Sequence, residues 1–301
     1  MTRWRERTVD VDGPVRVVEY GGSGPRTFVC VHGLGGWAMD WQLLASGLTR
    51  WGRVVALDLP GFGDSPLAGR ATSLDAHQRL LGRFLAAEAD RPVVLLGNSM
   101  GATVALLHAA RRPTTVDRLV LVSPVLPTSP RRRPHPLVTV QFLLYSVPGV
   151  GEWFVRARRD RIDHRRLVDM ALSFLTTNPE LVPREVYEER YALIARHAAT
   201  ADSDQAFLGT ARSLMLLLAE PGRYRHVIRR VRVPTLVVHG SDDRLVSARC
   251  ADHLTRLRPD WAVTVLPQVG HVAQLEAPRA VTAAVERWMF AVAATPAESA
   301  G

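Results

Sequence analysis

Short apolar runs alternate with helical patterns over the first 126 residues of the chain. The apolar runs are rich in β-branched residues and lie at residues 15–20, 27–31, 54–57, 93–96 and 119–122. Helical periodicity instead marks residues 74–89 and 102–112. Strands of about five residues that are apolar on both faces and separated by helices are typical of a parallel sheet covered on both sides. The pattern therefore predicts an α/β fold.

The middle of the chain has a different pattern. Residues 123–136 are rich in proline and arginine, and the roughly 90 residues that follow contain no convincing strand. Helical stretches there lie at residues 137–145, 165–176, 184–197 and 204–219. Beyond residue 232 the alternation returns, with strands at 235–238 and 263–266 and helices at 248–258 and 277–292. We therefore predict a core in two parts, residues 1–126 and 231–301, interrupted by a helical insertion over residues 127–230.

The length of 301 residues suffices for one large domain that carries an insertion. No apolar run reaches the roughly 18 residues of a membrane span, and the N-terminus lacks the apolar stretch of a secretory signal. The two cysteines, Cys30 and Cys250, fall within a strand pattern and a helical pattern, which indicates buried, reduced thiols. We therefore expect a cytoplasmic protein without a membrane span.

The formal net charge is +9, and arginine is the only basic residue besides histidine. The arginines are scattered, with one concentration between Arg131 and Arg166, and no nucleic-acid-binding motif accompanies them. A solvated basic face is the default interpretation, and attraction of an anionic substrate or an acidic partner stays open. We expect a small-molecule substrate and no nucleic acid as the partner, and the pattern does not indicate an oligomeric state.

An abrupt change from strand to helix occurs at Ser99. The apolar run before it ends in Gly97-Asn98, and Met100-Gly101 opens the next helical pattern. A sharp strand-to-helix turn strains the central residue and leaves room only for small residues two positions to either side. It also lifts the serine hydroxyl to a helix N-terminus, where negative charge is favoured. A glycine pair in a plain turn is the alternative, so Ser99 is a candidate nucleophile that needs catalytic partners.

Three loops at strand ends can supply those partners. Asp242 and Asp243 follow the strand at 235–238, and His271 follows the strand at 263–266. Both loops lie on the rim where parallel sheets place their sites. Histidine can take the serine proton, and a carboxylate can orient the histidine and stabilise its cation. The small-residue loop 32–36 can direct backbone N–H groups at an oxyanion, for which the N–H groups of Leu34 and Met100 are the candidates.

Five stretches, VHGLGGW, LDLPGFGDS, LLGNSMGA, VVHGSDDRLV and VGHVAQLEAP, lie between residues 29 and 278. Through them the chain resembles the α/β-hydrolase superfamily, close to the lid-bearing esterases, C–C hydrolases and cofactor-free haloperoxidases. The resemblance implies a mostly parallel eight-stranded sheet flanked by helices, with an all-helical lid inserted after the sixth strand. It also implies a triad in the order Ser99, Asp243, His271, which selects Asp243 over Asp242. No cofactor is implied, and no metal-ligand spacing occurs.

The surroundings of the triad are less specific. The candidates for the substrate pocket are Gly33, Trp37, Asn98 and Val272. Core packing is an equal alternative for Trp37. Asn98 resembles the residue before the nucleophile in C–C hydrolases, whereas those enzymes usually carry tryptophan where this chain has Val272. His32 and His239 precede glycines at strand ends, which favours a structural role for both.

Ester hydrolysis through an acyl-enzyme, on a small to medium and largely apolar substrate, is the leading hypothesis. A serine at position 99 argues against the relatives that use an aspartate nucleophile, the epoxide hydrolases and haloalkane dehalogenases. C–C bond hydrolysis of ring-fission acids, which are vinylogous 1,5-diketones, is the alternative, because the arginine-rich lid could hold a carboxylate. A ligand receptor on the same fold is a third hypothesis, since fold alone does not define function.

Overall fold

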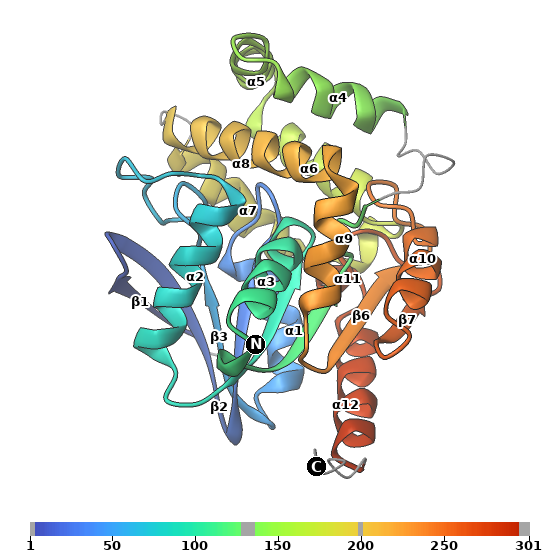
Figure 1. The fold of residues 1–301 in the computed structure, drawn as a ribbon. Coiled ribbons are helices and arrows are strands. Elements are labelled where there is room, and N and C mark those ends of the chain that lie inside the picture. The colour runs from blue at the N-terminus through green and yellow to red at the C-terminus, as the bar shows by residue number, and fades with distance from the viewer. Residues whose placement is uncertain (1–3, 128–135, 198–200, 295–301) are drawn as a thin grey trace.

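The computed structural model describes residues 4–127, 136–197 and 201–294, which contain one seven-stranded sheet (Figure 1). The strands are β1 (Arg5–Asp10), β2 (Pro14–Val31), β3 (Gly52–Leu57), β4 (Val93–Asn98), β5 (Val116–Val122), β6 (Thr235–Gly240) and β7 (Ala262–Leu266). The order along the sheet is β1-β2-β4-β5-β6-β7, and β3 pairs with β2. β1 is antiparallel to β2, whereas the pairs from β2–β4 to β6–β7 are parallel. The predicted α/β fold with a mostly parallel sheet is confirmed.

The N-terminal strands differ from the expectation. The runs at residues 15–20 and 27–31 belong to one continuous strand, β2, because the glycine-rich turn between them stays paired with β3. Leu57 of β3 pairs with Val17 from the first half of β2 and with Val31 from the second half, so β3 lies between the two halves. The expected count of eight strands is therefore wrong for the described residues, which form seven. The helical insertion follows β5, which is the sixth strand when the two halves of β2 are counted separately.

Helices cover both faces of the sheet. α1 (Gln42–Leu48) and α12 (Pro278–Ala294) pack together on one face, and α2 (Leu74–Glu88), α3 (Met100–Arg111) and α10 (Arg249–Leu257) lie on the other. The side chains of β4 alternate between these two layers. Leu95 belongs to the apolar cluster beneath α2 and α3, and Leu96 belongs to the cluster beneath α1 and α12. Both faces of β4 are thus buried, as the continuous apolar run of its sequence indicated.

Between β5 and β6 the described residues form helices and no strand. These are α4 (Pro136–Ser146), α5 (Val150–Arg161), α6 (His164–Leu175), α7 (Arg184–His197), α8 (Ala201–Ala219) and α9 (Pro221–Arg230), with the short helix η3 (Pro179–Leu181) before α7. We call residues 136–230 the helical segment. Helices α4 to α8 lie together over one end of the sheet (Figure 1). Four of them match predicted helices, whereas α5 and α9 were not predicted, and the expected boundary at residue 127 adjoins residues outside the described ranges.

Three short elements complete the described chain: η1 (Ala38–Trp41), η2 (Pro113–Thr115) and α11 (Ala273–Glu276). Across the described ranges, every helix is too short or too polar to cross a membrane.

Two buried histidines on helices of the core should make the free energy of unfolding depend on pH. His77 Nε2 lies 3.0 Å from Thr210 Oγ1, and His108 Nε2 lies 2.9 Å from Thr115 Oγ1. Burial lowers the pKa of His77 to about 3 and that of His108 to about 4. Unfolded histidines have a pKa of about 6.5, so below that pH the unfolded chain binds more protons than the folded chain. Stability should therefore fall as the pH falls from 6.5, by up to about 1.4 kcal/mol per pH unit for each histidine.

Urea unfolding at pH 7 and pH 5 would measure this loss of stability. A His77→Gln variant should show a smaller difference between the two pH values than the parent chain. An equal difference in both proteins would contradict the assignment of His77 as one of the groups responsible.

Candidate active site

Ser99 lies where β4 changes directly into α3. Its backbone has a φ of 54° and a ψ of −116°, a conformation that residues other than glycine rarely adopt. A Cβ atom on Gly97 would lie 2.5 Å from the carbonyl oxygen of Gly101, and a Cβ atom on Gly101 would overlap the end of β2. Only glycine therefore fits at both flanking positions. The strained strand-to-helix turn expected from the sequence is present in the structure.

Asp243 and His271 come together in the loops that follow β6 and β7. His271 Nδ1 lies 2.7 Å from Asp243 Oδ2, and both side chains are buried. The second carboxylate oxygen, Asp243 Oδ1, accepts hydrogen bonds from the backbone N–H groups of Leu245 (2.9 Å) and Val246 (2.8 Å). These bonds orient the carboxylate so that Oδ2 faces the imidazole. Asp242 is exposed instead, and its carboxylate accepts a hydrogen bond from the Ser241 hydroxyl.

The environment of Asp243 keeps its carboxylate charged. Burial acts to raise the pKa of Asp243, but the nearby His271 charge and the hydrogen bonds from His239 and His271 hold this pKa below its usual range. His239 Nε2 lies 3.2 Å from Asp243 Oδ2 and 2.8 Å from the Val246 carbonyl oxygen. His239 therefore contacts the acid directly, which its position before a strand-end glycine does not indicate. An anionic Asp243 can stabilise a positive charge on His271.

Asn98 connects the strand of the serine to the loop of the histidine. Its side-chain amide donates to the carbonyl oxygens of Val122 (3.2 Å) and His271 (3.3 Å). His271 Nε2 is buried and has no hydrogen-bond partner among the described residues. The structure thus joins histidine to acid but shows no hydrogen bond between Nε2 and Ser99. Nε2 is the ring nitrogen left available for proton transfer.

The small-residue loop after β2 lies against the serine. A Cβ atom on Gly33 would lie 3.4 Å from Ser99 Cβ and 3.0 Å from Asn98 Oδ1, so glycine permits this close approach. Leu34 follows in the same loop, which is closed by a hydrogen bond of 3.0 Å from Gly36 N to the Gly33 carbonyl oxygen. Met100 is the first residue of α3, and N–H groups in the first turn of a helix lack acceptors within the helix. The candidate N–H donors therefore come from two segments that meet at Ser99.

Glu276 holds the histidine loop, a role that the sequence analysis did not predict. Its buried carboxylate accepts hydrogen bonds from the backbone N–H groups of Gly270 (2.7 Å), Thr177 (2.9 Å) and Asn178 (2.7 Å). The His271 N–H also donates to the Leu175 carbonyl oxygen at 2.6 Å. The loop of His271 is therefore attached to the helical segment between α6 and α7. The only sequence signal was the position of this glutamate five residues after the histidine.

Replacing Glu276 with glutamine should misplace the histidine loop. The amide retains one acceptor oxygen but turns an NH₂ group toward backbone donors, so we expect a stability loss of about 1–3 kcal/mol. We also expect kcat to fall by about 10- to 100-fold, because a small displacement of a catalytic base is costly. Urea unfolding and steady-state kinetics would check both effects. Retention of full activity in Glu276→Gln would contradict the positioning role.

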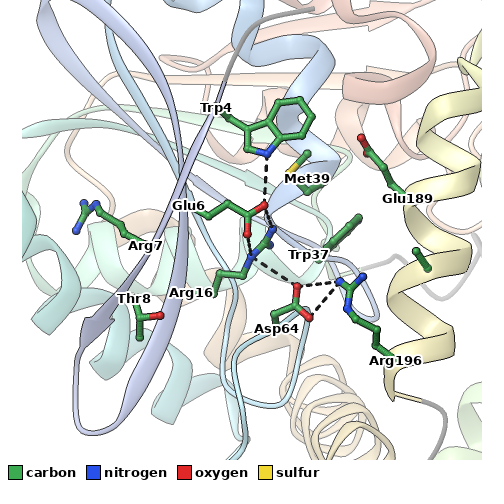
Figure 2. Close-up of a pocket in the computed structure, with 11 residues that line it drawn as sticks. Trp4, Glu6, Arg7, Thr8, Arg16, Trp37, Met39, Asp64, Glu189 and Arg196 are labelled. Carbon is green, nitrogen blue, oxygen red and sulfur yellow. Dashed lines mark hydrogen bonds and ion pairs between the residues drawn. The ribbon is translucent and has the colours of Figure 1, made fainter.

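Two of the candidate pocket residues, Val272 and Trp37, lie in different environments. Val272 packs in an apolar cluster with α6 and α7 residues. Trp37 lines a cavity of about 650 Å³ between the N-terminal strands and α7, and the residues lining this cavity do not include the candidate triad. Figure 2 shows that ion pairs cross this cavity, joining Arg16 to Glu6 and Asp64 to Arg196. Within the described ranges, no group of three His, Cys, Asp or Glu side chains is arranged to hold a metal ion.

A sequence profile described as alpha/beta hydrolase fold matches residues 26–278. The dihydrolipoyllysine-residue acetyltransferase component of the acetoin cleaving system of Pseudomonas putida is 30% identical over 273 residues, which cover 87% of this chain and 63% of that protein. The 2-hydroxy-6-oxo-2,4-heptadienoate hydrolase of Pseudomonas putida is 30% identical over 271 residues, which cover 89% of this chain and 86% of that protein. The structure of Cfl2 from Burkholderia cenocepacia has a TM-score of 0.79 at 24% identity and covers 95% of each chain.

The chain therefore belongs to the α/β-hydrolase family. Its relatives include proteins named as a lipase, a heptadienoate hydrolase and a methyl ester esterase. The matched region spans only 63% of the length of the acetoin-system protein of Pseudomonas putida. It spans 64% of the length of the corresponding protein of Cupriavidus necator.

Proposed function

We propose that Ser99, His271 and Asp243 form a catalytic triad that hydrolyses carboxylic esters. The observation that carries this proposal is the buried contact of 2.7 Å between Asp243 and His271. Asn98, which precedes the strained Ser99, donates a hydrogen bond to the His271 carbonyl oxygen. An imidazole held by a carboxylate on one nitrogen is poised to act as a base through the other. The serine at the helix N-terminus is the group that such a base activates.

The reaction proceeds in two halves. In the first, Ser99 Oγ attacks the ester carbonyl carbon while its proton passes to His271 Nε2, and the leaving alkoxide then takes that proton. In the second, a water molecule gives a proton to Nε2 and attacks the acyl-enzyme, which releases the acid and restores Ser99. The backbone N–H groups of Leu34 and Met100 stabilise the oxyanion in both halves, by about 2.7–4 kcal/mol for each donor.

In this proposal residues 127–230, which include the helical segment, act as a lid inserted between core parts 1–126 and 231–301. We call residues 32–36 the oxyanion loop. Phe207 of α8 would lie 3.5 Å from a Cβ atom on Gly35 of this loop. The Phe207 ring packs at 5.1 Å from Tyr145, which is also in contact with Phe142 and Phe154. Apolar rings therefore reach the oxyanion loop. They support a small to medium, largely apolar substrate.

C–C bond hydrolysis of ring-fission acids is the alternative, and the identity to a heptadienoate hydrolase favours it. That reaction needs a group that binds the substrate carboxylate. The guanidinium of Arg190, on α7, forms an ion pair with the buried Asp40. Asp40 lies against Gly36 of the oxyanion loop, so this arginine is near the candidate site. An arginine that already holds a carboxylate from its own chain is a poor binder for a second one, so we prefer ester hydrolysis.

An activity comparison tests this choice. The purified chain should hydrolyse p-nitrophenyl butyrate with a kcat/KM at least tenfold above that for a ring-fission dienoate, and a fluorophosphonate probe should label it. Dominant turnover of the dienoate would reverse the assignment. Absence of labelling, together with turnover of neither substrate, would exclude an activated serine.

A further inference from the structure

The two outermost helices carry an apolar surface that no described part of the chain covers. On α4, the side chains of Val140 and Leu143 are 55% and 56% exposed, and that of Val147, directly after the end of α4, is 49% exposed. On α5, Val150 and Trp153 are 39% and 62% exposed. We call these five residues the outer face of α4–α5. Helices α4 and α5 lie at the end of the molecule opposite α12, above the other helices of the segment (Figure 1).

The sequence of α4 explains why this surface is unusual. Its opposite side is also apolar, because Val138 and Tyr145 are buried, and Tyr145 packs against residues of α5 and α8. A helix that is apolar on all sides is normally buried on all sides. The spacing of Val140 and Leu143 places them on one side of α4, and Val147 follows at the end of that helix. A contiguous apolar surface of this kind marks a site of interaction.

Positive charge borders the same surface. Residues 150–166 contain six arginines and three acidic residues. Arg159 pairs with Asp204, and Arg165 lies 3.7 Å from Glu188. Three other arginines, all on α5, are exposed and have no ion-pair partner among the described residues: Arg156, Arg158 and Arg161. The outer face of α4–α5 therefore combines aliphatic side chains, an exposed tryptophan and uncompensated arginines.

We propose that the outer face of α4–α5 docks on the surface of an anionic membrane. Tryptophan is suited to the boundary between lipid and water, and arginines beside an apolar stripe attract anionic headgroups. A second copy of the chain fits this surface less well, because a symmetric contact would bring two sets of arginines together. The inner side of α4 continues through Tyr145 to Phe207, which reaches the oxyanion loop. Docking would thus place the aromatic cluster between the lipid and Ser99.

Vesicle sedimentation tests the docking surface directly. The full chain should bind vesicles of phosphatidylcholine and phosphatidylglycerol at a ratio of about 7:3, and bind phosphatidylcholine vesicles weakly. A Leu143→Ser, Trp153→Ser double variant should lose at least about tenfold in partitioning. An Arg156→Gln, Arg161→Gln double variant should lose about fivefold for each arginine on the anionic vesicles. The control Leu181→Ser, at a residue that is 58% exposed on η3, should bind as the parent chain does.

Binding of the Leu143→Ser, Trp153→Ser variant at the parental level, or no binding of the parent chain to anionic vesicles, would overturn the proposal. A dimer in light scattering that this variant dissociates would also overturn it, because the surface would then join two copies. All substituted side chains are exposed, and the arginine variant provides a second test should the apolar variant fold poorly. A Ser99→Ala variant should bind vesicles normally, so docking and hydrolysis can fail separately.

Discussion

Replacing Ser99 with alanine should lower kcat for ester hydrolysis by about 10⁴-fold or more, because the chain would lose the atom that forms the acyl-enzyme. Any residual rate would come from substrate binding and from the oxyanion donors, which the substitution leaves in place. The fold should persist, since Ser99 makes its structural contacts through its backbone N–H and carbonyl groups.

Steady-state kinetics and fluorophosphonate labelling would measure the effect on the same preparations. Ser46→Ala is a matched control, because Ser46 is an exposed serine on α1. The control should retain parental activity and labelling. Labelling that persists in Ser99→Ala and disappears in another serine variant would show that the nucleophile is a different residue.

The neighbouring aspartates Asp243 and Asp242 should respond very differently to the same substitution. Asp243→Asn should lower kcat by about 10⁴-fold, the size of effect seen when a triad acid becomes an amide. The backbone N–H groups of Leu245 and Val246 would keep the amide oxygen at the position of Oδ1, so the NH₂ group would face His271. Nδ1 would then accept a hydrogen bond, and Nε2 would carry the proton. In that tautomer His271 cannot take a proton from Ser99.

Asp242→Asn serves as the control for this substitution. Asp242 is exposed and directly precedes Asp243 in the same loop. The kcat of the Asp242→Asn variant should therefore differ from that of the parent chain by less than about threefold. Kinetics of the two variants at neutral pH would compare them. A large loss in Asp242→Asn with little loss in Asp243→Asn would reverse the assignment of the triad acid.

The sequence predicted those features that depend on local rules. Gly97 and Gly101 predicted the strained turn at Ser99, because a sharp strand-to-helix junction excludes larger side chains wherever it occurs. The positions of Asp243 and His271 after consecutive strands predicted that they share one rim. The choice of Asp243 over Asp242 came only from the family resemblance. Local pattern cannot rank two adjacent carboxylates, and the structure separates them by burial and by the contact with His271.

The features that the sequence did not predict depend on contacts between distant segments. The continuity of β2 depends on pairing with β3 across a glycine-rich turn, where local rules indicate a break. The role of Glu276 depends on N–H groups about 100 positions earlier in the chain, at Thr177 and Asn178. The surroundings of Trp37 depend on α7, whose packing against the core is not encoded in any short motif.

The attachment of the histidine loop to residues 175–178 has a consequence for engineering. Exchanging inserted helices between relatives is an attractive way to transplant substrate preference onto a fixed catalytic scaffold. In this chain the exchanged piece would include the Leu175 carbonyl group and the two N–H groups that Glu276 binds. A chimera that replaces residues 175–178 would change the position of His271 as well as the substrate pocket. The exchanged segments should therefore end before residue 175 or begin after residue 178.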